Sequence, residues 1–156
     1  MGELVWSEHE TLLYYLGKMR KAVVRTMDGL GEEDVRQPGV PSGTNLLGIV
    51  YHLVGVEAHW FRRVFLGEDV DPDMSMDAPP AMAKDDVVAA YRAECARSDE
   101  IIRACPDLGT LAATNNPGEG ELVALRIIAA HMIEETARHA GHADILREQL
   151  DGVTND

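Results

Sequence analysis

The sequence is poor in basic residues and contains only two cysteines. Its 156 residues include 14 Lys and Arg against 27 Asp and Glu, which gives a formal net charge of −13 at pH 7. This acidic excess repels phosphate groups, so we expect no binding to nucleic acid and none to anionic membrane surfaces. Cys95 and Cys105 would lie about 15 Å apart on one helix, which is too far for a disulfide. We expect both to be reduced, packed thiols.

Long apolar runs and familiar catalytic signatures are also missing. The longest stretch without a charged side chain, residues 37–56, becomes apolar only at Leu46 and is too short to cross a bilayer about 30 Å thick. The N-terminal segment is acidic where a secretory signal is basic, so we expect a cytoplasmic protein. There is no Gly-rich phosphate loop after a strand, and no C-x-x-C, G-x-S-x-G or H-E-x-x-H motif. Length and composition suit one domain over residues 1–156.

Helical spacing of apolar residues is what the sequence does contain, in four long stretches. They are approximately residues 7–28, 44–67, 84–104 and 121–150. Ser7 with Glu10 makes a capping-box pattern at the first start, and Thr44 or Asn45 is the expected N-cap of the second helix. The Pro-containing segment of residues 68–83 predicts a long connection. We therefore predict an all-α protein, an antiparallel four-helix bundle with a long crossover loop.

The fourth helix carries polar side chains in the middle of its inward stripe. The stripe is Leu125, Ile128, Met132, Glu135, His139, His142 and Leu146. Burying a carboxylate and two imidazoles without partners costs several kcal/mol, so a cation or another partner must satisfy them. Glu135 and His139 are four residues apart, which places both on one helix face within reach of one metal ion.

A third ligand must come from another helix, because a straight helix cannot present more side chains to one ion. His52 is the best candidate, since it lies in an otherwise apolar run, and His59 is the alternative. Two imidazoles and one carboxylate suit Zn²⁺ first, with Ni²⁺ or Fe²⁺ as alternatives, and leave coordination positions free. His142 and His131 are candidates to line a polar cavity beside such a centre.

Structural roles are the competing interpretation for each of these residues. Glu/His pairs four apart occur by chance on many helices, and a histidine in an apolar helix is often a hydrogen-bonded core residue. Glu135 could simply pair with His52 or His139. His9 is expected at the rim, and Cys95 lies on an inward stripe without a basic neighbour, so packing explains it better than nucleophilic chemistry.

Two segments nevertheless resemble a known family. SGTNLLGIVYHLVGVEAHWF and HMIEETARHAGHADILREQLDG are similar to the DinB-like superfamily of metal-binding four-helix bundles, and within it to the small actinobacterial members. In that superfamily one histidine of the second helix and two residues four apart in the fourth hold the metal, which implies His52, Glu135 and His139. Many relatives have histidine at the position of Glu135, whereas the mycothiol-dependent maleylpyruvate isomerase branch has a similar His, Glu, His set.

The resemblance implies thiol chemistry. A divalent metal would lower the pKa of mycothiol, bacillithiol or glutathione, and the thiolate would attack an electrophilic substrate in an S-transferase or isomerase reaction. His142 or His131 would act as a proton shuttle, on position alone. The alternatives are a non-catalytic, stress-associated protein that binds a metal or a ligand, and a purely structural bundle. A homodimer is compatible with a bundle of this size, and the substrate is not specified.

Overall fold

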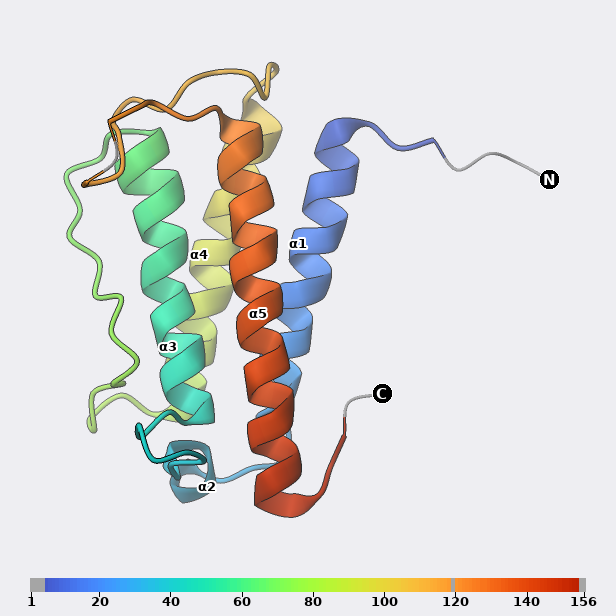
Figure 1. Ribbon diagram of the computed structural model, residues 1–156, viewed down its shortest axis with the longest axis vertical. Coiled ribbons are helices and arrows are strands. Elements are labelled where there is room, and N and C mark those ends of the chain that lie inside the picture. The colour runs from blue at the N-terminus through green and yellow to red at the C-terminus, as the bar shows by residue number, and fades with distance from the viewer. Residues whose placement is uncertain (1–4, 119, 155–156) are drawn as a thin grey trace.

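A computed structural model describes residues 5–118 and 120–154 of the chain, which form a helical bundle (Figure 1). The helices are α1 (Glu8–Arg25), α2 (Glu32–Arg36), α3 (Leu46–Glu57), the π-helical segment η1 (Ala58–Phe65) that continues α3, α4 (Lys84–Ala104) and α5 (Leu125–Asp151). Within the described residues, β-structure is limited to one isolated bridge between Leu111 and Ala124. The predicted all-α fold is confirmed.

The long crossover makes α4 run in the same direction as α3. In Figure 1, α1 and α5 run downward, and α3 and α4 run upward. The segment of residues 66–83 returns along the outside of α3, so α4 starts at the same end as α3 and runs parallel to it. Around the bundle, α1 packs on α5, α5 on α3, α3 on α4, and α4 on α1. The antiparallel neighbours are therefore α3 with α5 and α4 with α1.

Capping patterns in the sequence predicted most helix ends correctly. The Ser7 hydroxyl accepts a hydrogen bond from the Glu10 N–H at 3.2 Å, and the Glu10 carboxylate accepts one from the Ser7 N–H at 2.7 Å. Asn45 caps α3 through the N–H of Gly48. Helix α5 begins at Leu125, later than expected, because the preceding segment forms turns that the bridge at Leu111 holds in place.

The short helix α2 and the π-helical form of residues 58–65 were not expected from the sequence. Five residues are too few to show a helical period, so α2 is recognisable only from its acidic first turn. In η1 the helix widens, and the N–H of Leu66 bonds to the carbonyl of Phe61, five residues back. Such π-turns occur often at functional sites.

The core is divided into two apolar clusters with polar residues between them. One cluster lies around Leu47, Leu53, Tyr91 and Ala143, and the other around Leu16, Phe61, Ile102 and Met132. Buried Arg20, Ser98 and Thr136 lie between members of the two clusters along α1, α4 and α5, and buried Glu57 of α3 bonds to Arg20 and Ser98. Both cysteines are free thiols. Among the described residues no helix is long and apolar enough to span a membrane.

Candidate metal centre

Helices α3 and α5 bring together the three side chains singled out in the sequence. His52 lies on α3, and Glu135 and His139 lie one turn apart on α5. One ligand atom from each residue lies within 4.8 Å of the others. The Glu135 Oε1 atom is 3.4 Å from His52 Nε2 and 3.0 Å from His139 Nε2. Ligand atoms around a tetrahedral Zn²⁺ are about 3.3 Å apart, so this spacing suits a small divalent ion.

Two glycines of α3 allow the crossover segment to orient His52. A Cβ atom on Gly48 would overlap the carbonyl of Met76, and a Cβ on Gly55 would overlap the carbonyl of Asp73. The backbone can therefore lie directly on the helix between them, where the Met74 carbonyl is 2.5 Å from His52 Nδ1. Because a carbonyl only accepts, Nδ1 carries a proton, and Nε2 is the ring atom that faces Glu135 Oε1. This is the usual arrangement of a metal-binding histidine.

The protonation states also suit a cation. Burial, the largest contribution, raises the pKa of Glu135, but the hydrogen bond to His52 and the charge of His139 outweigh it and hold the pKa low. Burial lowers the pKa of His139 and outweighs the attraction of Glu135. A carboxylate with a lowered pKa beside the imidazole of His139, whose pKa is also lowered, is a set of electron-pair donors that a divalent cation could complete.

The other histidines lie outside this three-residue group. The His142 ring is exposed, with its centroid 5.6 Å from that of His139. His131 lies two turns before His139 on α5, and its ring stands edge-on to that of Trp60 with the two ring centroids 4.8 Å apart. His59, the alternative ligand, bonds through Nε2 to Asn116 at 2.8 Å instead. His9 bonds to the carbonyl of Cys105 near the rim of the bundle.

A second cluster of buried charge was missed in the sequence. Glu57 is fully buried at the end of α3 and accepts two hydrogen bonds of 2.7 Å from Arg20 and one of 2.6 Å from the Ser98 hydroxyl. Burial lowers the pKa of Arg20, but the Glu57 carboxylate outweighs it, so the guanidinium stays charged. Arg20 also bonds to Asp99 at 2.6 Å. The sequence signal that could have revealed this cluster is Glu57 itself, an acidic residue in an otherwise apolar helix.

Comparison with known proteins first defines the fold class and then the family. The crystal structure of a DinB-like protein from Bacillus cereus ATCC 10987 superposes with a TM-score of 0.66 at 18% identity, covering 92% of this chain and 96% of that chain. The fold is therefore DinB-like, as the sequence resemblance implied. The profile of the mycothiol-S-transferase family matches residues 11–152, and the chain belongs to this family. No curated protein matches the chain.

Proposed function

We propose that the protein is a divalent-metal-dependent S-transferase that uses a small thiol of the mycothiol class. The observation that carries the proposal is the convergence of His52, Glu135 and His139, with both Nε2 atoms directed at one carboxylate oxygen. Membership in the mycothiol-S-transferase family supports the reaction class. Zn²⁺ is the first candidate for the metal, and Ni²⁺ and Fe²⁺ are the alternatives, because all three accept mixed imidazole and carboxylate ligands.

The three residues and their supports would perform distinct tasks. His52 is oriented by the Met74 carbonyl, His139 is held by burial, and Glu135 supplies the negative charge. A divalent ion held there supplies a positive charge that keeps a thiol in its reactive thiolate form at neutral pH. With three protein ligands, the site leaves room for an exogenous thiol.

His142 is the proposed acceptor of the thiol proton, because its exposed ring lies beside His139 and can pass the proton to water. The sulfur forms a bond to an electrophilic carbon, and the leaving group departs with its bonding electron pair. His131 is the second candidate, but its contact with Trp60 favours a role as a wall of the substrate site. An isomerase that uses the same thiol is the related reaction.

The test uses untagged protein loaded with Zn²⁺, mycothiol, and monobromobimane as the electrophile. Wild type should bind one metal ion and accelerate the conjugation, and bromide should be released in equal amount to the thioether. The His139→Ala variant should lose both the metal and the acceleration, whereas His9→Ala should retain both. Replacing His142 by Gln should lower turnover while the metal content stays at one.

Metal binding and catalysis can fail separately in this test. Full metal content without thiol binding or conjugation would overturn the transferase and support the non-catalytic metal-binding protein. Equal, negligible metal in wild type and His139→Ala would overturn the metal centre itself. In that case Glu135 and the two imidazoles are a structural group.

A further inference from the structure

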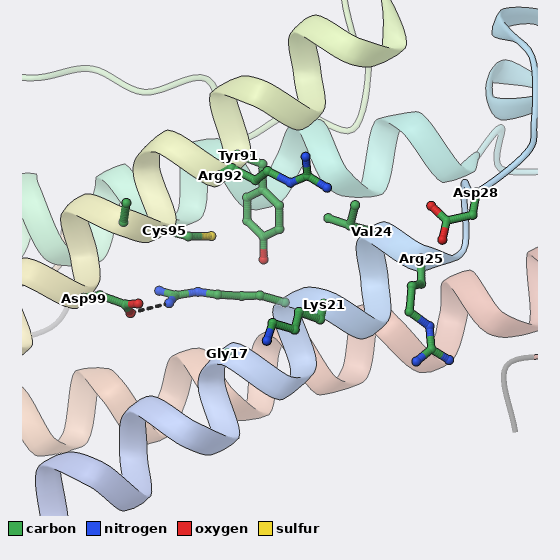
Figure 2. A pocket seen from close by; sticks show the side chains of 11 residues that line it. Gly17, Lys21, Val24, Arg25, Asp28, Tyr91, Arg92, Cys95 and Asp99 are labelled. Atoms are coloured by element: carbon green, nitrogen blue, oxygen red, sulfur yellow. Dashed lines mark hydrogen bonds and ion pairs between the residues drawn. The ribbon is translucent and has the colours of Figure 1, made fainter.

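We propose that a pocket between α1 and α4 binds an organic monocarboxylate with an apolar body, at a site separate from the metal centre. The pocket has a volume of about 470 Å³, within the usual range for small-molecule sites. Its lining residues come from α1, the turn after it, and α4 (Figure 2). The metal-centre residues come from α3 and α5, the opposite side of the bundle.

A glycine in the middle of α1 keeps this pocket open. Gly17 lines the pocket, and a Cβ atom added there would meet no atom within 4 Å. Its backbone is ordinary helix, so neither strain nor a close neighbour requires glycine. Glycine within a helix costs about 1 kcal/mol relative to alanine. A side chain at this position would project into the pocket, so glycine there leaves the cavity unfilled.

The pocket also contains a buried hydrogen-bond donor whose neighbouring acceptor is the weak Cys95 sulfur. Tyr91 is 1% exposed, and its hydroxyl has no hydrogen-bond partner among the described residues. The Cys95 thiol lies beside it as a weak sulfur acceptor, which an oxygen atom of a ligand would replace with a stronger hydrogen bond. Figure 2 shows the ring reaching from α4 toward α1 with the hydroxyl between the helices. Burial raises the pKa of Tyr91, so the phenol remains a donor for a ligand oxygen.

The charge around the pocket is opposite to that of the whole chain. Four cationic and two anionic side chains line it, although the chain has a formal net charge of −13. Glu57 and Asp99 neutralise Arg20, so the positive charge offered to a ligand comes from the exposed Lys21 and Arg92 on the two facing helices. A local positive field in an acidic protein attracts anions.

These features together specify the ligand class. The ring of Tyr91 and the side chains of Val24 and Ala96 give the pocket apolar walls that suit a hydrocarbon body. The phenol donor and the cations of Lys21 and Arg92 suit an acid group. A medium-chain or aromatic monocarboxylate combines both parts. The inference does not depend on the thiol reaction proposed above.

The test measures the binding of octanoate and of its neutral analogue octanamide by calorimetry, using full-length protein with its metal. Octanoate should saturate one site, and octanamide should bind about tenfold more weakly, because it lacks the charge that Lys21 and Arg92 recognise. Lys21→Gln should weaken octanoate binding, whereas Lys18→Gln, the same charge change on an exposed part of α1 outside the pocket, should not.

Two further variants separate binding from folding. Gly17→Leu should fill the pocket and abolish octanoate binding while raising the melting temperature, and Gly141→Leu, which also projects into open space, should leave binding unchanged. Tyr91→Phe keeps the ring and should weaken binding roughly fivefold. His139→Ala should leave octanoate binding intact.

Four results would each overturn the proposal. They are no octanoate binding by wild type, equal binding of octanoate and octanamide, wild-type affinity in Gly17→Leu, and loss of binding in His139→Ala. The last result would place octanoate at the metal centre instead.

Discussion

Two carboxylates on apolar helix faces differ in how the protein satisfies them. Glu57 is enclosed by its own counterion, Arg20, and by the hydroxyl of Ser98, so every charge in that group has a protein partner. Glu135 faces only the imidazoles of His52 and His139, both of which are electron-pair donors when neutral. The first group is complete in itself, whereas the second, in our proposal, is completed by a cation. Buried charge alone therefore does not indicate a metal site, and the difference in positive charge is what separates the two groups.

Removing a partner from the complete group should have the largest effect. Arg20→Ala leaves Glu57 buried without its counterion, and such a loss costs about 3–5 kcal/mol. Denaturant unfolding measures the change. The control is Arg126→Ala, whose ion pair with Glu8 is solvent-exposed and should contribute far less to the free energy of unfolding.

The double variant Arg20→Met with Glu57→Leu sharpens this prediction. Replacing both partners removes the charge and its desolvation cost together, so the double variant should be more stable than Arg20→Ala alone. If Arg20→Ala and Arg126→Ala are equally mild, the contrast between a complete and an incomplete group is wrong.

Metal removal should affect only the incomplete group. A ligand present at 100 to 1,000 times its dissociation constant stabilises the folded state by about 3–4 kcal/mol. A chelator should therefore lower the melting temperature of wild type but not of His139→Ala, as measured by calorimetry. The His9→Ala variant should respond as wild type does. A chelator-independent melting temperature in wild type would favour the structural interpretation of Glu135.

The crossover should influence the metal centre through glycine packing. Gly55→Ala forces the backbone at Asp73 away from α3 and weakens the hydrogen bond from His52 to Met74. Loss of such an outer partner typically costs 10-fold or more in metal affinity. Zn²⁺ titration against a competing chelator measures it. Gly141→Ala, in open space, is the control, and equal affinities in both variants would contradict the orienting role of the crossover.

The smallest expected effect is a decrease in the free energy of unfolding at alkaline pH, caused by Cys95 in the α1–α4 pocket. Burial, the largest contribution, raises the pKa of the Cys95 thiol, so the unfolded chain ionises first as the pH rises. The contribution of Cys95 to the free energy of unfolding is therefore constant below the pKa that this thiol has in the unfolded chain. Above that pKa it falls, by about 0.7 kcal/mol between pH 8 and pH 9. Unfolding of Cys95→Ala measured at both pH values should lack this loss. An identical pH dependence in wild type and Cys95→Ala would contradict it.

Periodicity and capping predicted most of the fold because they depend on neighbours along one helix. Ser7 and Asn45 cap as expected, and α4 has the predicted bounds. The spacing of Glu135 and His139 is likewise a local property. In contrast, α2 has too few residues to show a period. The start of α5 depends on the bridge between Leu111 and Ala124, which no pattern within a single helix contains.

The partners of buried charges depend on contacts that no local pattern encodes. Arg20 and Glu57 are separated by 37 residues, and His52 is 83 residues from Glu135. Composition and helical stripes were enough to indicate a helical bundle with a polar interruption and the three ligand candidates. Only the packing of the helices decided that Glu57 is neutralised internally, that a loop carbonyl orients His52, and that a pocket stays open beside Gly17. The physical reason is that burial and pairing arise between helices.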